Sequence, residues 1–177
     1  MPCAGADGFL VMHRVRAESL GLPHVRILAT IERHNAYSDD PIQYRGGWAM
    51  DAATLWHDAA LAPDDIDVIQ TYDDYPVISM LQFEDFGFCA KDAGAEYIRG
   101  NDFGPDGNRP HNTGGGQLSG GQAGAAGGFL GLVEALRQLT NQAGTHQVPN
   151  ARHALVSGFG MINYDRGLCT AAAVLAA

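Results

Sequence analysis

Residues 112–128 read Asn-Thr-Gly-Gly-Gly-Gln-Leu-Ser-Gly-Gly-Gln-Ala-Gly-Ala-Ala-Gly-Gly and lead without a break into 129–139, Phe-Leu-Gly-Leu-Val-Glu-Ala-Leu-Arg-Gln-Leu. Glycines permit positive φ and close approach of the backbone to a ligand. Free N–H groups at the start of a helix attract an anion or an oxyanion. The alternative is a flexible surface loop. Because the stretch runs straight into a helix with one apolar face, we interpret it as a ligand-facing turn.

Glycine clusters also form phosphate-binding loops, and such loops have characteristic glycine spacings. The sequence contains no G-x-G-x-x-G, no G-x-x-x-x-G-K-[ST] and no G-x-S-x-G. The sequence therefore does not support a dinucleotide-binding fold, a P-loop or a serine hydrolase nucleophile elbow.

The rest of the chain alternates short β-rich runs with helical patterns. We predict one α/β domain over residues 1–177, built from layered helices covering a mixed, mostly parallel five-stranded sheet. Residues 90–127, between the third and fourth predicted helices, should be largely irregular. The predicted strands are 8–13, 25–31, 66–71, 154–157 and 168–175, and the predicted helices are 14–20, 48–61, 76–87 and 129–139.

Composition narrows the function classes. The 177 residues carry 11 Lys+Arg against 20 Asp+Glu, a formal charge of -9, which disfavours nucleic acid and anionic membranes as partners. We expect no membrane span, because the longest nearly uncharged stretch, 112–133, is rich in glycine and polar residues. The first residues lack the pattern of a signal peptide, so we expect a cytoplasmic protein with reduced thiols at its three cysteines.

The histidines and cysteines show no metal-ligand spacing, so we predict no bound metal. His111 directly precedes the glycine turn and is expected to be a surface imidazole. Cys89 and Cys3 are expected to have no chemical role.

Two motifs carry a family resemblance. Asn112-Thr113-Gly114-Gly115-Gly116, followed by Gly121-Gln122-Ala123 and the helix at 129–139, resembles the Asn-x-x-Gly-Gly turn and Gly-His-Pro segment of the thiolase superfamily. The stretch 72–89 is similar to the His-Asp-Cys-Phe segment and following helix of the sterol-carrier or lipid-transfer type of thiolase. The resemblance implies a thiolase-like C-terminal half whose loop, formed by Asn112, Gly114, Gly115, Gly116 and Gly121, faces a coenzyme A thioester. Coenzyme A would then be part of the substrate, with no tightly bound cofactor.

The resemblance covers only half of a thiolase. Family members contain two similar halves, and the N-terminal half, which carries the nucleophilic cysteine, has no counterpart in this chain. A fragment, a naturally split subunit or a truncated reading frame would each explain this, and we expect an N-terminal thiolase-like half as its partner and a two-fold oligomer. The predicted helices 48–61 and 129–139 have apolar stripes that we expect to remain uncovered without such a partner.

The departures from the family bear on chemistry. Gln122 replaces the Gly-His-Pro histidine, and an amide donates hydrogen bonds to an oxyanion but cannot act as a base. Tyr72 stands where thiolases place an Asn or His, and its phenol carries a proton only if its surroundings lower a pKa of about 10. Cys169-Thr170-Ala171 lies near the C-terminal Cys-x-Gly motif, so Cys169 is either an acid/base or a small buried strand residue.

These departures resemble the thiolase-like aldolases of bacterial steroid side-chain degradation, which use tyrosines and a small OB-fold partner. The resemblance implies retro-aldol cleavage of a β-hydroxyacyl-CoA, with Tyr72 and Tyr164 as catalytic candidates and Asp73 as an orienting or capping group. Two alternatives remain open: a divergent acyl-CoA thiolase or acyltransferase using Cys169, and a non-catalytic subunit that binds an acyl-CoA or a partner.

Overall fold

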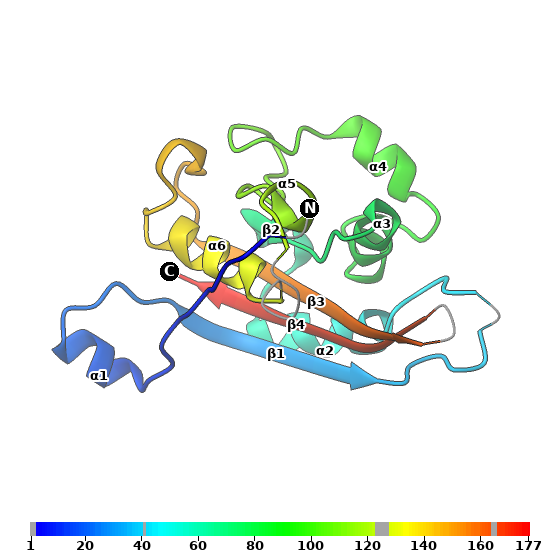
Figure 1. Cartoon of the computed structure of the whole chain (residues 1–177), viewed down its shortest axis with the longest axis horizontal. Coiled ribbons are helices and arrows are strands. Elements are labelled where there is room, and N and C mark those ends of the chain that lie inside the picture. The colour runs from blue at the N-terminus through cyan, green and yellow to red at the C-terminus, as the bar shows by residue number, and fades with distance from the viewer. Residues whose placement is uncertain (1–2, 41, 123–127, 164–165) are drawn as a thin grey trace.

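A computed structural model describes residues 3–40, 42–122, 128–163 and 166–177, with the backbone alone over 161–163 and 166–168. Its sheet has four strands in the order β1-β4-β3-β2 (Figure 1). β4 pairs antiparallel with both β1 and β3, and only the short β2 pairs parallel with β3. The strands are β1 (Arg26–His34), β2 (Val68–Gln70), β3 (His153–Asn163) and β4 (Arg166–Ala176).

The α/β class is confirmed, but the expectation of five mostly parallel strands is wrong. Residues 8–13 lie outside the sheet, with Leu10 81% and Val11 75% exposed, so an apolar run alone did not make a strand. β3 and β4 are antiparallel, with Asn163 opposite Arg166. Only two residues separate the end of β3 from the start of β4 in sequence. A parallel pair would need a crossover connection of a dozen or more residues.

The predicted helices are present, and two short ones interrupt the stretch expected to be irregular. α2 ends two residues before its predicted limit, and α6 begins one residue after its predicted start. The α-helices are α1 (Arg14–Ser19), α2 (Trp48–Ala59), α3 (Pro76–Asp85), α4 (Gly94–Gly100), α5 (Gly116–Ser119) and α6 (Leu130–Leu139). None of these helices is long and apolar enough to cross a membrane.

α2 covers one face of the sheet because its apolar residues recur at helical spacing. Trp48 and Leu55 are fully buried. The Trp48 ring stacks on Phe159 of β3 with centroids 5.7 Å apart and lies 6.1 Å from Phe86, and its indole donates to the Ala171 carbonyl at 3.2 Å. Full burial of a large apolar side chain contributes about 1.5–3 kcal/mol, so this aromatic cluster anchors the fold.

α6 covers part of the opposite face. Ala135 and Leu139 pack with Val156 of β3 in a second, smaller apolar cluster. Since residues of β4 alternate between the two clusters, the clusters lie on opposite faces of the sheet. The apolar stripes of α2 and α6 are thus buried within this chain, which corrects the expectation that they remain uncovered.

Candidate active site at the glycine turn

The segment after β2 and the glycine turn lie side by side. The Asn112 amide N–H donates to the Ile69 carbonyl at 2.9 Å, so the turn continues alongside the sheet edge. The Asn112 side chain accepts from the Thr71 N–H at 2.9 Å and donates to the Thr71 carbonyl at 3.1 Å. Asn112 has φ 44°, in the left-handed region that Asn tolerates better than most residues. Asn112 therefore fixes the two segments to each other.

Two of the three glycines in the turn are required by geometry. Gly115 and Gly116 have φ of 98° and 58°. A side chain on Gly116 would collide with the Asp73 carboxylate, and one on Gly115 would lie 2.9 Å from the Gly120 nitrogen. The group that lies close to Gly116 is thus the Asp73 carboxylate, which belongs to this chain.

Asp73 is buried, and its Oδ1 accepts the Gln117 backbone N–H at 2.7 Å, at the start of the short helix α5. This contact holds the glycine turn against the segment after β2. From the sequence Asp73 is expected to orient or cap the helix that begins at Pro76; its hydrogen bond is instead with the backbone at the start of α5.

Asp74 joins two of the site residues predicted from the sequence, Tyr72 and Gln122. Its Oδ2 accepts the Tyr72 hydroxyl at 2.9 Å and the Gln122 side-chain amide at 2.9 Å. The Gln122 nitrogen also donates to Gln117 Oε1 at 3.1 Å. Both hydrogens of the Gln122 amide therefore have partners within the chain, and Gln122 holds Asp74 in place. This shared contact is not predicted from the sequence.

The Tyr72 phenol is protonated in this setting. Burial and the hydrogen bond to the Asp74 carboxylate both raise the pKa of Tyr72 well above its ordinary value. The lowered pKa required for Tyr72 to act alone as a base is absent. A neutral phenol bonded to a carboxylate can instead accept one proton while passing its own to Asp74.

The Tyr72 backbone is held by Gln82, a residue that the sequence did not single out. Gln82 is fully buried; it accepts the Tyr72 N–H at 3.2 Å and donates to the Tyr72 carbonyl at 2.8 Å. Ser157 of β3 donates to Gln82 Oε1 at 2.6 Å. These contacts fix the Tyr72 backbone, while its ring packs against Phe159 with centroids 5.5 Å apart. The only sequence signal for them is a polar residue at an inward position of a predicted helix.

His111 is not the surface imidazole that we expected. Its ring packs against Phe83 and Phe103, with centroids 4.9 and 5.8 Å away. Its Nε2 lies 2.7 Å from the Thr71 hydroxyl. Burial lowers the pKa of His111 to about 4, so the ring is neutral near pH 7. The surface position predicted for His111 is wrong because Phe83 and Phe103, which come from elsewhere in the chain, pack against its ring.

A shallow pocket lies against the turn, and a polar network forms its floor. Buried Glu134 of α6 accepts the Thr113 hydroxyl at 2.6 Å and the Gln138 amide at 2.9 Å. Gly114 and Gly116 reach the pocket wall, so backbone of the turn is accessible from it. The pocket is lined by Gln70, Thr71, Asn112, Gly114, Gly116, Gln117, Leu130, Gly131, Glu134 and Arg137.

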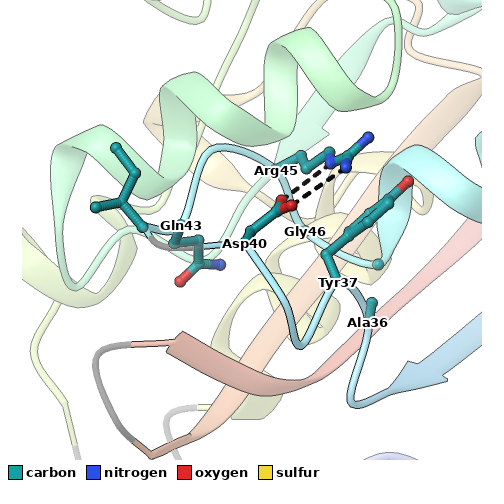
Figure 2. Close-up of a pocket in the computed structure, with 8 residues that line it drawn as sticks. Ala36, Tyr37, Asp40, Gln43, Arg45 and Gly46 are labelled. Atoms are coloured by element: carbon teal, nitrogen blue, oxygen red, sulfur yellow. Dashed lines mark hydrogen bonds and ion pairs between the residues drawn. The ribbon is translucent and has the colours of Figure 1, made fainter.

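A second pocket lies far from these groups in sequence, within the loop between β1 and α2. Figure 2 shows Arg45 directed at Asp40 beside the Tyr37 ring. The guanidinium bonds to Asp40 at 3.1 and 3.3 Å and lies 3.7 Å above that ring. Because none of the candidate catalytic residues lines this pocket, it is a packed loop rather than part of the site.

The remaining candidates are not joined to this site by any contact in the described residues. Cys169 lies on β4, with its sulfur 3.8 Å from His34 Nε2. Tyr164 falls outside the described residues. Gly121 has φ 104° and directly precedes Gln122, so it turns the chain that delivers the amide to Asp74.

Comparison with known proteins decides the family. Residues 29–170 match the family model described as "Thiolase C-terminal domain-like". The chain belongs to this family. Human sterol carrier protein 2 is 33% identical over 110 residues, 62% of this chain and 20% of its own length, which agrees with the lipid-transfer type of thiolase inferred from the motifs.

Two further relatives are enzymes by name. The benzoylsuccinyl-CoA thiolase subunit BbsB of Thauera aromatica is 25% identical over 168 residues, 88% of this chain and 42% of its own length. The 17-hydroxy-3-oxo-4-pregnene-20-carboxyl-CoA lyase of Mycobacterium tuberculosis is 33% identical over 103 residues, 58% of this chain and 26% of its own length. The chain thus spans less than half the length of these relatives.

A solved structure shares the fold. The Ltp2-ChsH2(DUF35) aldolase matches with a TM-score of 0.74 at 23% identity, covering 88% of this chain and 40% of that one. Together the comparisons place the chain among thiolase-like proteins that include thiolases and lyases.

Proposed function

We propose that the chain is the C-terminal half of a carbon–carbon lyase that cleaves a β-hydroxyacyl-CoA by a retro-aldol reaction, giving a ketone and a short acyl-CoA. A steroid side-chain thioester is the substrate class suggested by the Mycobacterium tuberculosis relative. The observation that carries the proposal is the hydrogen bond of 2.9 Å between Tyr72 and Asp74. It supplies a proton path where a thiolase would use histidine.

The reaction balances through this pair. The substrate's β-hydroxyl gives its proton to the Tyr72 oxygen as the Tyr72 proton moves to Asp74. The Cα–Cβ bond breaks, its electrons form the thioester enolate, and the carbonyl of the released ketone forms. Asp74 then returns the proton through Tyr72 to Cα, which completes the short acyl-CoA. The raised pKa of Tyr72 suits this relay because a free phenolate is never required.

The enolate oxygen carries the developing charge, and we assign its stabilisation to the backbone N–H groups of Gly114 and Gly116, since the Gly115 N–H already donates to the Asn112 carbonyl at 2.7 Å. Preorganised backbone donors are worth about 10²–10³ in rate for comparable oxyanions. The pocket that Gly114 and Gly116 line supports this assignment. Gln122, whose amide is engaged by Asp74 and Gln117, serves as a positioning residue for Asp74.

The complete enzyme requires a second, thiolase-like half, because the matched relatives extend well beyond this chain. We assign its contact surface to the open part of β3, where a Cβ on Gly158 or Gly160 would meet nothing within 4 Å. Leu10 and Val11 add exposed apolar surface. A small OB-fold protein, a two-fold oligomer and a cytoplasmic location complete the proposal.

A divergent thiolase is the second candidate, supported by the benzoylsuccinyl-CoA thiolase relative. Against it, Gln122 cannot accept a proton as the family histidine does. The expected acid/base Cys169 has a pKa raised by burial and by Glu32, and its described contact is with His34.

Product analysis separates these candidates. The complete two-half enzyme is incubated separately with a β-hydroxyacyl-CoA and with a β-ketoacyl-CoA, each with and without free CoA, and the ketone and acyl-CoA products are quantified. The lyase proposal expects equimolar ketone and short acyl-CoA in the absence of free CoA. CoA-dependent cleavage of the β-ketoacyl-CoA, with the β-hydroxyacyl-CoA unchanged, would identify the thiolase instead, and unchanged substrate in all arms would favour a non-catalytic binding subunit.

A further inference from the structure

Three metal-binding side chains meet on the pair β1 and β4, away from the glycine turn. Glu32 and His34 are two residues apart on β1 and so share a face of the sheet. Cys169 is paired with His34 across the ladder. The distances are 2.5 Å from His34 Nε2 to Glu32 Oε1 and 3.8 Å from His34 Nε2 to Cys169 Sγ.

We propose that Glu32, His34 and Cys169 bind a zinc ion. Their ligand atoms all lie within 4.8 Å of one another. Tetrahedral zinc, with bonds of about 2.0–2.3 Å, places its ligands about 3.3–3.6 Å apart. The distance of 3.8 Å between Cys169 Sγ and His34 Nε2 is already close to this ligand–ligand separation. The carboxylate needs to withdraw by about 1 Å, which is easy because the Glu32 side chain is 65% exposed.

The chemistry of the set selects zinc over harder cations. A thiolate and an imidazole favour zinc, whereas calcium and magnesium prefer oxygen ligands alone. Both strands hold the ligands in one register, so little ordering is required on binding.

Three protein ligands leave the fourth position of a tetrahedral ion open. Space for it exists on the same face. Gly160 of β3 lies opposite Cys169 in the ladder, and a Cβ there would meet nothing within 4 Å. A water or a side chain from a partner can complete the coordination.

This proposal departs from the sequence expectation of no metal. Cys169 lies 135 residues from His34 in sequence, so no local spacing of residues predicts these three ligands. It is also independent of the lyase proposal, since no described contact links these residues to Tyr72 or Asp74.

The test titrates the chelator-treated full chain with Zn²⁺ by calorimetry and with Co²⁺ by absorption spectroscopy. We expect one ion per chain and a thiolate-to-cobalt charge-transfer band. Replacing an outer-sphere partner of a metal typically costs 10–100-fold in affinity, so loss of a direct ligand in Cys169→Ser or His34→Gln should cost at least 100-fold. Exposed Glu32→Gln should also weaken binding. Because Glu32 lies at the surface, this substitution should leave the fold intact, which a thermal melt checks.

Cys89→Ser and His24→Gln are matched controls and should bind as the parent chain does. Equal affinity in the parent, Cys169→Ser and Glu32→Gln, or a cobalt spectrum without thiolate charge transfer, would overturn the site.

Discussion

On the α2 face of the sheet the rings of Trp48 and Phe86 pack with Phe159 of β3, whereas on the other face Ala135 of α6 packs with Val156. Farther along β3 on that face, a Cβ on Gly158 or Gly160 would meet nothing within 4 Å. The first face is filled by large side chains from this chain alone. The second is only partly covered by α6. It also carries the polar network of Thr113 and Glu134 beside the turn. The contrast indicates that stability resides mainly in the α2 face, while the pocket beside the glycine turn lies by the other face. The Tyr72 ring, 5.5 Å from Phe159, packs against the edge of the α2-face cluster.

The largest effect expected from this contrast is on the α2 face. Trp48→Ala removes a fully buried ring stacked on Phe159 and should lower the free energy of unfolding by about 3–5 kcal/mol. Urea denaturation followed by circular dichroism measures it. Met50→Ala, on the same helix but 47% exposed, is the control and should change stability by less than about 0.5 kcal/mol. Similar losses in both variants would contradict the assignment.

The next effect concerns acid stability at the edge of the site. The pKa of His111 is about 4 when folded and about 6.5 in the unfolded chain. Because the unfolded state binds the proton more readily, this contribution is complete above pH 6.5 and is lost as pH falls toward 4. Its full size is about 3 kcal/mol.

Urea midpoints measured between pH 4 and 7.5 check this prediction. His111→Gln should have a shallower decline in that window, whereas exposed His24→Gln should follow the parent chain. Parallel curves for His111→Gln and the parent would show that the ring is not buried neutral.

A smaller effect is expected within the turn. Gly116→Ala forces a side chain into positive φ and against Asp73, and should cost about 2 kcal/mol of stability. Gly100→Ala, at the end of α4 with open space around it, is the control and should be neutral or slightly stabilising. An unaffected Gly116→Ala melting curve would mean that the turn relaxes away from Asp73.

The smallest effect on folding is expected on the open face. Gly158→Ser adds a side chain where nothing lies within 4 Å, so stability of the chain should change by less than about 0.5 kcal/mol. Assembly with the thiolase-like half should nonetheless weaken, as measured by light scattering. Intact assembly in Gly158→Ser would place the partner elsewhere.

Sequence reasoning succeeded where a pattern is local. The helix around Trp48 and Leu55 follows from apolar spacing, and the positive φ at Gly115 follows from the glycine run. Tyr72 and Gln122 were identified from motif positions. Their connection through Asp74 was not, because it joins residues 48 apart in sequence.

The failures have a common physical origin in long-range contacts. The run at 8–13 has strand composition but no pairing partner in the described sheet. His111 looks polar and local, yet Phe83 and Phe103 enclose it. The antiparallel order depends on β4 pairing with both β1 and β3, which no single stretch of sequence encodes.

The relay from Tyr72 to Asp74 is tested most directly by a double-mutant cycle in the complete two-half enzyme, with Tyr75→Phe as the exposed control. Tyr72→Phe and Asp74→Asn should each lower kcat by about 10²–10⁴-fold with little change in KM. If the two residues pass one proton, the double variant should be no slower than the slower single variant. Multiplying losses, or full turnover in Tyr72→Phe, would contradict the relay.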